Sequence, residues 1–398
     1  CNQPTPPPLP ENLFLRNFKD HLGNDIDNPW IEKTNHGANA GVNGARIVWL
    51  DEANLVHLAN GSAAISHDAA GNAYLQFEVR ASDIKSGNAV VAATKDGTVV
   101  WSWHLWFAPQ SALTPIPFAN YQGKLYNFTT ETLGWKPTKW EGTVYQSPRS
   151  VKFRVEQTIA NNGVKQYTDI TITQLPGTIR KGYATFYQFG RKDPFPASRE
   201  ADILKSTKTV IAYKNLSFKN CIQNPQIFYR SDAVEEQKEH RTLLSQYNLW
   251  SAENDVYGAE ELQYNDNPVI KTVYDPSPAG FKMPASNAFT GSTSKPSDTT
   301  GAGEANSAEA ASSNLYEYNL GHNFWINSNH TATIYMPALG CRHPYSFEAE
   351  AFGVQGYYWT ACPYDFLTGC DFVFRSQSVA PKYKGSRLAG CSVRPVTE

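Results

Sequence analysis

The stretch GYYWTACPYDFLTGCDFVFRSQSVAPKYKGSRLAGCSVRPV, from Gly356 to Val396, gives the clearest indication of fold in this chain of 398 residues. It predicts three short strands, Tyr357–Ala361, Asp371–Phe374 and Cys391–Val396, separated by turns that contain glycine and proline. Strands this short bury too little apolar surface to be stable alone. We therefore expect an antiparallel meander that closes onto earlier parts of its own domain.

Two motifs in this stretch resemble the Fibrobacter major paralogous domain, whose members finish with a G-x-Y-W-[ST] strand and a G-[FYC]-S-V-R-P-V strand. Here the motifs are Gly356–Thr360 and Gly390–Val396. The resemblance implies a fold similar to C-type lectin-like domains and to formylglycine-generating enzymes. It does not imply an activity, because the family has no single established one.

Further motifs, in the expected order, are similar to those of longer Bacteroidetes surface proteins related to fimbrillins and pilus-associated lipoproteins. They are HLGNDIDNPW (His21–Trp30), GNAVVAATKDGTVVWSWHLWF (Gly87–Phe107), YQFGRKDPFP (Tyr187–Pro196), IQNPQIFY (Ile222–Tyr229), NLW (Asn248–Trp250) and TVYDPSPAGFKMPASNAFTG (Thr272–Gly291). The resemblance therefore covers most of the chain.

Before residue 109 the chain alternates short apolar and polar runs, which is typical of a small β-sandwich. The sequence Lys95-Asp96-Gly97 predicts a tight hairpin turn. In the strand that follows, Trp101, Trp103, Leu105 and Phe107 share the apolar face, which we expect to pack inward. His104 lies on the other face, where we expect a tolerated polar neighbour rather than a ligand.

The predicted fold class is mainly β with some α. Residues 1–11 are expected to be a lipoprotein tether, residues 12–109 a β-sandwich domain, and residues 118–398 a C-type lectin-like α+β domain, with a connector at 109–117. The clearest hairpin joins Ser150–Ile159 to Tyr167–Leu175 across Asn-Asn-Gly.

A stretch rich in Ser, Thr, Gly and Ala, Gly291–Ser313, predicts a mobile surface loop because it offers little apolar surface to bury. Within it Asp298-Thr299-Thr300 resembles the O-glycosylation sequence of Bacteroidetes. The resemblance makes Thr299 the expected attachment site.

Composition limits the partners and the location of the chain. The 35 Lys and Arg nearly balance the 37 Asp and Glu, and basic runs interleaved with aromatics are missing, so nucleic acid is not an expected partner. No apolar run reaches the roughly 18 to 20 residues that span a bilayer. Cys1 and the following NQPTPPPLP look like an acylated cysteine on a polyproline-like tether, and Asn2 resembles the outer-membrane sorting signal. We therefore expect an outer-membrane lipoprotein, anchored by lipid and exposed on the cell surface.

The other five cysteines leave two interpretations open. Four of them lie in the last 58 residues, where disulfides such as Cys370–Cys391 and Cys341–Cys362 would staple a loop-rich region. Buried free thiols acting as small apolar groups are the alternative. Zinc-ligand spacings are missing, so no metal site is predicted.

Motifs of catalysis are also missing from the sequence, including G-x-S-x-G, a phosphate loop and H-E-x-x-H. We therefore expect no enzyme and no cofactor. Aromatic and arginine side chains near the C-terminus are the expected contacts to a protein or glycan partner. They are Tyr345, Phe347, Tyr358, Tyr364 and Arg375. The expected function is that of an adhesin or pilus-associated lipoprotein, and the alternative is an accessory lipoprotein of an outer-membrane nutrient-uptake complex.

Overall fold

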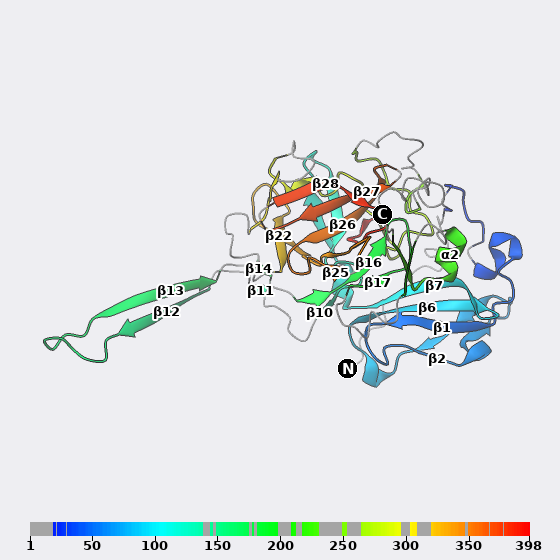
Figure 1. Cartoon of the computed structure of the whole chain (residues 1–398), viewed down its shortest axis with the longest axis horizontal. Coiled ribbons are helices and arrows are strands. Elements are labelled where there is room, and N and C mark those ends of the chain that lie inside the picture. The colour runs from blue at the N-terminus through cyan, green and yellow to red at the C-terminus, as the bar shows by residue number, and fades with distance from the viewer. Residues whose placement is uncertain are drawn as a thin grey trace.

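The computed structural model describes residues 19–20, 22–28, 30–137, 144–145, 149–174, 177–178, 181–197, 208–211, 217–230, 249–252, 264–295, 303–308, 320–346, 349–365, 367–376 and 378–398. These residues form a mainly β structure, as predicted. The one α-helix among them is α2 (Phe218–Gln223), which Ser217 caps by accepting a hydrogen bond from the N–H of Asn220. Figure 1 shows a body built of several small sheets, with one hairpin standing out from it.

An antiparallel sheet of three strands lies at the N-terminal side of the body, in the order β1 (Gly44–Leu50), β6 (Gly87–Lys95) and β7 (Thr98–Phe107). The predicted turn between β6 and β7 is confirmed, since Asp96 and Gly97 have φ values of 50° and 78°. Two ribbons accompany the sheet, β2 (His57–Leu58) with β5 (Phe77–Glu78) and β3 (Ile65–His67) with β4 (Ala73–Leu75). The division into a sandwich domain and a lectin-like domain stays a prediction.

The predicted C-terminal meander exists, but its third strand is a different segment. β26 (Gly356–Pro363), β27 (Thr368–Phe374) and β28 (Ser378–Ser386) run antiparallel, and β21 (Gly303–Glu304) pairs with β28. β28 contains Pro381 and Gly385 and falls outside the three predicted strands. The segment Cys391–Val396, predicted as the third strand, belongs to two other sheets.

The last residues close the fold in these two sheets, as predicted. β29 (Gly390–Cys391) lies at the centre of a five-stranded sheet, between β16 (Thr185–Gln188) and β24 (Cys341–Arg342), with β17 (Phe195–Pro196) and β25 (Ala349–Glu350) at its edges. β30 (Val396–Thr397) lies between β9 (Leu125–Thr129) and β20 (Phe281–Lys282), and β8 (Pro115–Ala119) completes this sheet. β8 begins inside the predicted connector 109–117, which is therefore structured.

The remaining elements are short. The other ladders are β10 (Lys136–Pro137) with β15 (Gly182–Tyr183), β11 (Val144–Tyr145) with β14 (Gly177–Thr178), β12 (Arg149–Glu156) with β13 (Tyr167–Gln174), β18 (Lys208–Ile211) with β19 (Ile227–Arg230), and β22 (Gly321–Trp325) with β23 (Thr333–Pro337). The 3-10 turns are η1 (Ile31–Lys33), η2 (Asn35–Gly37), η3 (Gly61–Ala64), η4 (Ala81–Asp83), η5 (Gln110–Leu113) and η7 (Thr290–Ser292).

Stacked aromatic rings fill the main core between these sheets. Phe289 stacks on Phe372 with ring centroids 4.8 Å apart, and Phe189 packs on Trp250 at the same distance. The Nε1–H of Trp359 donates to the backbone O of Tyr187 over 2.8 Å, so this fully buried indole keeps its hydrogen bond.

All five cysteines from Cys221 onward are free and buried, so the disulfide interpretation is wrong. Burial raises the pKa of the Cys362 thiol to about 11 and that of Cys341 to about 12. Cys341 and Cys391 fill positions in the main apolar cluster.

The predicted mobile loop Gly291–Ser313 is held in place wherever it is described. Ser292, Thr293 and Ala305 are buried, and Thr293 forms a bridge with Ala305. Gly291 packs so closely that a Cβ there would lie 2.1 Å from the backbone O of Ala119. Composition misled here because small side chains allow backbones to approach each other and exchange hydrogen bonds. Residues 296–302, which include Thr299, and residues 309–313 lie outside the described residues, so the prediction of a mobile loop stays a prediction for them.

Candidate functional site

A hollow of about 1500 Å³ opens where the N-terminal sheet meets the segments around α2. Its wall comes from five parts of the chain that are distant in sequence: residues 20–42, the region from β3 to β5, the hairpin of β6 and β7, α2, and the segment Val273–Tyr274. In Figure 1 this region lies at the right-hand end of the body, where β7, α2 and the blue N-terminal segment come close together.

Aromatic rings line the hollow and remain partly open to solvent. The lining aromatics are Trp30, Tyr74, Phe77, Trp101, Trp103 and Tyr274. Trp103 is 37 % exposed and Tyr74 is 44 % exposed. Trp30 packs edge to face on Tyr74, with ring centroids 5.2 Å apart, so the segment of residues 20–42 contacts β4 at this point. Rings this exposed are available to a ligand.

The strand β7 presents the tryptophans to the hollow, contrary to our expectation that this face would pack inward. The C-terminal end of this face does pack inward, because Leu105 and Phe107 contact the small apolar cluster around Leu55 and Val91. Trp103, however, faces solvent. Trp101, on the same face, is covered in part by Lys192 and Tyr274. The hydrogen bonds that join β7 to the rest of the body come from the opposite face.

That opposite face is joined to the body by hydrogen bonds. The hydroxyl of Ser102 donates to the carboxylate of Asp193 over 2.6 Å, and the Nε1–H of Trp106 donates to the backbone O of Trp135 over 3.0 Å. The N–H of Trp49, on β1, similarly donates to the O of Pro194 over 3.1 Å. β7 is thus anchored from behind, while Trp103 on its other face stays 37 % exposed.

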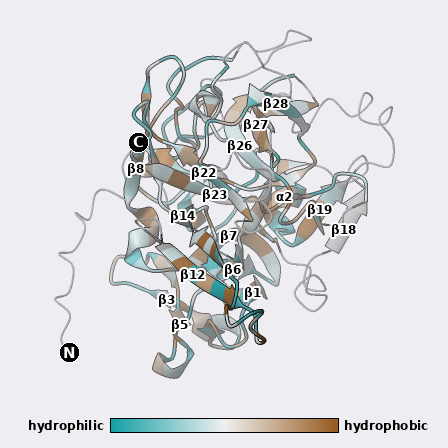
Figure 2. Ribbon diagram, turned by 90° about the vertical axis from the view of Figure 1, so that its left-hand side faces the viewer, coloured by the Kyte–Doolittle hydropathy of each residue, from teal (hydrophilic) through white to brown (hydrophobic). Residues whose placement is uncertain are grey.

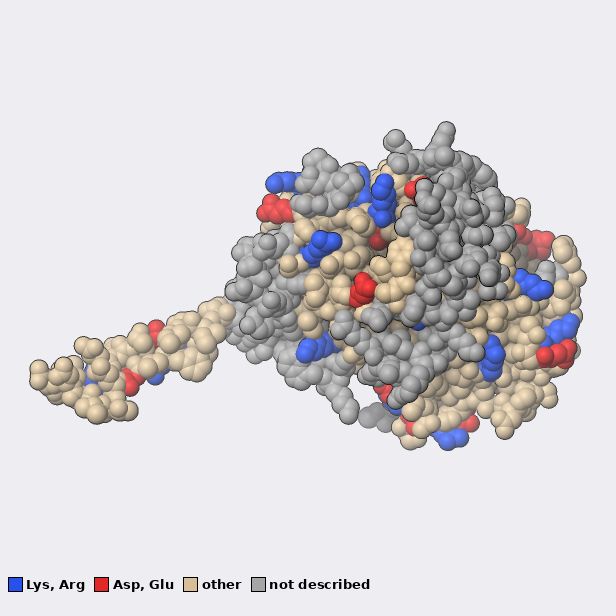
Figure 3. All heavy atoms as spheres, viewed as in Figure 1, with Lys and Arg blue, Asp and Glu red and all other residues tan. Residues whose placement is uncertain are grey.

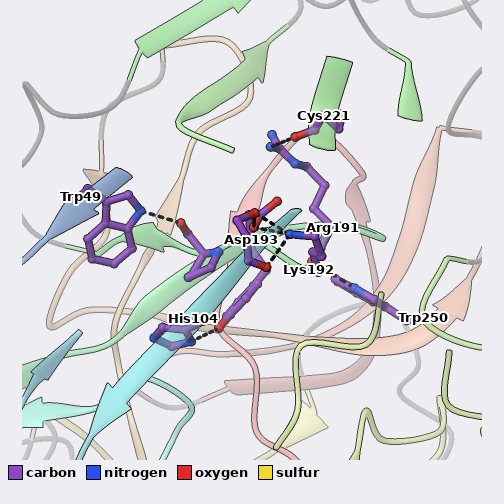
Figure 4. A network of polar contacts seen from close by, with 10 residues as sticks. Trp49, His104, Arg191, Lys192, Asp193, Cys221 and Trp250 are labelled. Carbon is purple, nitrogen blue, oxygen red and sulfur yellow. Dashed lines mark hydrogen bonds and ion pairs between the residues drawn. The ribbon is translucent and has the colours of Figure 1, made fainter. Parts of the chain in front are cut away.

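His104 belongs to this anchoring network, as Figure 4 shows from close by. The amide N of Asn88 donates to Asp51 and to Gly134, so its Oδ1 accepts the Nε2–H of His104 over 2.9 Å. The other ring nitrogen, Nδ1, accepts from the hydroxyl of Tyr187 over 3.0 Å. Burial lowers the pKa of His104 to about 3, so the imidazole is neutral and structural.

Lys192 and Asp193 form a buried ion pair behind Ser102. The ammonium of Lys192 donates to Asp193 over 2.7 Å and to the hydroxyl of Ser102 over 2.6 Å. Burial lowers the pKa of Lys192, while Asp193 opposes that effect. A serine can act as a nucleophile with a neighbouring lysine as its base. Ser102, however, is only 2 % exposed, and its hydroxyl donates a hydrogen bond to Asp193. We therefore assign the trio to structure.

The same turn pattern, D-x-x-G-N, borders the hollow twice, at Asp20–Asn24 and at Asp68–Asn72. In both turns the aspartate carboxylate accepts from the N–H and the side-chain amide of the asparagine. Asp68 also accepts from the hydroxyl of Tyr74 over 3.2 Å, which holds that ring at the rim. These hydrogen bonds lower the pKa of Asp68, so it stays ionised.

The polar part of the lining is rich in carboxylates and amides. It consists chiefly of Asp20, Asp25, Asp27, Asn28, Glu32, Asn39, Asn72 and Gln223, with Lys33 and Lys219 as cations. Such groups donate and accept hydrogen bonds from sugar hydroxyls, while the aromatic rings fit the apolar C–H faces of a sugar ring. The combination suits a hydrated polyol better than a purely apolar ligand.

The contact residues predicted from sequence are not part of this hollow and are not gathered into one site. Tyr358 is fully buried and donates its hydroxyl to the O of Pro337, so the prediction that it contacts a partner is wrong. Tyr345 packs on His343 and Tyr364 on Tyr264, and both are half-buried. Arg375 is exposed, but it follows one end of β27 whereas Tyr364 precedes the other. The strand between them is about 23 Å long. Phe347 lies outside the described residues.

Sequence reasoning missed the hollow because its parts are distant in sequence. Two signals were available: the tryptophans of β7 alternate with polar residues, and the motif His21–Trp30 combines acids, amides and a tryptophan. Neither signal says that the two segments meet.

The part of the chain that the structure describes contains no cluster of His, Cys, Asp and Glu arranged to hold a metal ion. Its helices include none that is long and apolar enough to cross a membrane. No known protein family, curated protein or solved structure matches the chain. The resemblance to fimbrillin-related lipoproteins and the lipid anchor at Cys1 therefore stay predictions, and residues 1–18 lie outside the described residues.

Proposed function

We propose that this chain is a non-enzymatic adhesin that binds a glycan in the aromatic hollow beside β7. The observation that supports the proposal best is the pair of exposed rings, Tyr74 and Trp103, in a hollow whose polar lining is rich in carboxylates and amides. Exposed large aromatic side chains lose little conformational entropy when they contact a ligand, because they have only two rotatable side-chain bonds. The anchoring network behind β7 keeps the platform in place before the ligand arrives.

The location of the protein is part of the same proposal. A lipid at Cys1 and a polyproline-like tether would hold the glycan site away from an outer membrane, as the resemblance to surface lipoproteins implies. The hydroxyl-binding groups of the hollow fit the glycans that such a surface protein meets.

The test is binding of soluble protein to a glycan array, followed by calorimetry with the strongest glycan. Trp103→Ala should weaken binding at least tenfold, which corresponds to about 1.4 kcal/mol, because a stacking surface is lost. The tryptophan is partly exposed, so the fold should tolerate the change. Tyr121→Ala is the matched control, since Tyr121 is 53 % exposed and lies in the turn between β8 and β9.

Equal affinity of the Trp103→Ala variant and the parent protein would contradict the site. If no glycan on the array binds, and the protein copurifies with a transporter barrel from native outer membranes, the nutrient-uptake alternative is favoured.

A further inference from the structure

The projecting hairpin of β12 and β13 has one apolar face and one polar face. Register pairs Val151 with Ile172 and Phe153 with Ile170, and these four side chains are each 49 to 56 % exposed. The predicted turn is confirmed, with φ values of 51° at Asn162 and 78° at Gly163. Figure 3 shows the hairpin standing clear of the body, and Figure 2, which looks along it, shows apolar and polar residues alternating on β12.

The polar face is satisfied within the hairpin itself. Arg154 donates to both carboxylate oxygens of Asp169, over 2.9 and 3.1 Å, and its guanidinium lies 3.9 Å from the ring centroid of Tyr167. The hydroxyls of Ser150 and Thr173 share a hydrogen bond of 2.9 Å. Because the side chains of this face bond to one another, a binding partner is expected to contact the strand edges or the apolar face.

The two edges of the hairpin differ in their protection. β12 carries Lys152 and Arg154, and charged side chains of this kind discourage edge pairing. β13 carries mostly Thr and Ile, and its aspartate, Asp169, is neutralised by Arg154. Among the described residues, β12 and β13 pair only with each other. A two-stranded hairpin is marginally stable in water, so β13 is an open edge of high β-propensity that lacks a third strand.

We propose that β13 pairs antiparallel with β13 of a second copy of this chain, with Ile170 opposite Ile170 of that copy. In this register Asp169 lies opposite Thr171 and Thr168 opposite Ile172, so like charges do not meet. Two hairpins then form one sheet of four strands, with the cations of β12 at its outer edges. The joined apolar faces gain cross-strand contacts at their centre.

Other occupants fit these observations less well. Pairing through β12 in a register that overlaps most of the strand would place Lys152 opposite Lys152 or Arg154 of the other copy, which is destabilising. A lipid interior would leave the edge N–H and C=O groups of the hairpin without partners. Face-to-face packing of two hairpins would bury only about half the side-chain surface of a few residues, which is less than a stable interface needs.

A disulfide trap tests the proposal in the full chain with Cys1→Ser. Opposed residues in antiparallel strands have Cα atoms about 4.5 to 5.5 Å apart, which is within disulfide reach. Ile170→Cys should therefore give a disulfide-linked dimer on mild oxidation. Phe153→Cys is the matched control, because Phe153 and Ile170 are cross-strand neighbours and both are 49 % exposed. In the four-stranded sheet its copies would lie about 14 Å apart, at three strand spacings, and should not link.

Crosslinking of the Phe153→Cys variant at an equal rate would mean face-to-face packing or random collision, and would overturn the proposal. So would the absence of a dimer with Ile170→Cys. Sedimentation provides a measurement without crosslinks: the parent protein should shift toward the mass of a dimer as its concentration rises. Ile170→Lys should remain a monomer, because it places two ammonium groups opposite each other.

Discussion

At the scale of single residues, buried polar groups hold this fold together through specific oxygen atoms. Arg394 is fully buried and donates to the backbone O of Thr129, Thr130 and Tyr335 and to the hydroxyl of Thr132. A side chain with five N–H donors can satisfy several backbone oxygens at once. Asp371 is the contrasting case, because its Oδ1 is buried and has no hydrogen-bond partner among the described residues.

We predict that Asp371→Asn stabilises the protein above neutral pH. Burial raises the pKa of Asp371 well above its usual range. A raised pKa in the folded state means that the folded protein holds its proton more tightly than the unfolded chain. The stabilisation of the folded state by this tighter proton binding is complete below the pKa of the unfolded chain, about 3.9. It is lost as pH rises through the pKa of the folded state.

Urea unfolding at pH 5 and pH 8 measures this effect. The advantage of Asp371→Asn over the parent should grow with pH, toward about 1 to 3 kcal/mol, the cost of a buried unsatisfied polar group. Asp27→Asn, at an exposed position, is the control and should give no such trend. An advantage for Asp371→Asn that stays constant or falls with pH would contradict the assignment.

Sequence reasoning was limited at this scale. The alternation around Val393 and Arg394 predicts opposite faces for the two residues, yet both are fully buried, because a second layer of chain supplies oxygen atoms to the arginine. Tyr358 was misassigned for a related reason, since an aromatic residue in a strand looks the same in sequence whether a neighbouring segment covers it or not.

At the scale of elements, local turn chemistry was the most reliable guide. Lys95-Asp96-Gly97 and Asn161-Asn162-Gly163 both form the hairpins that they predict, because the required positive φ values depend on neighbouring residues alone. β28 was missed because Pro381 and Gly385 are typical of turns, and only its pairing with β27 makes it a strand.

Gly340, just before β24, should be an essential glycine. Its φ is +68°, and a Cβ there would lie 1.9 Å from the backbone O of Glu350. We predict that Gly340→Ala lowers the free energy of unfolding by at least about 2 kcal/mol, more than the roughly 1 to 2 kcal/mol of the backbone conformation alone. Gly97→Ala is the control, because Gly97 has φ +78° and open space around it. Urea unfolding of the two variants separates the steric cost from the backbone cost, and equal losses would contradict the predicted clash.

At the scale of the whole molecule, the N-terminal sheet and the rest of the body share buried contacts. Asn88, Ser102 and His104 reach Gly134, Asp193 and Tyr187. Tyr187 in turn pairs with Cys391 of β29. The mainly β class could be predicted from composition and alternation, but these contacts and the hollow could not, because they depend on how distant segments pack.

Deleting residues 390–398 should therefore unfold the whole described body. The predicted division into a sandwich domain at 12–109 and a lectin-like domain at 118–398 implies the opposite, namely that the region 12–109 survives such a truncation and melts separately. The shared contacts now predict one calorimetric transition for the intact protein and none for the truncated one. If the truncated protein still melts with an enthalpy of about 60 to 80 kcal/mol, which is typical of a domain of 100 residues, the N-terminal sheet folds independently of the rest of the body.

The position of Arg394 also determines when the chain can fold. Its partner Thr129 precedes it by 265 positions, and Val396 pairs with Phe128 in the same sheet. A chain that emerges with its N-terminus first, from the ribosome or from an export channel, must therefore wait, with β9 lacking β30, until residue 396 has emerged. During that interval its aromatic strands are exposed to solvent, so synthesis of this protein should depend on chaperones that hold unfinished chains.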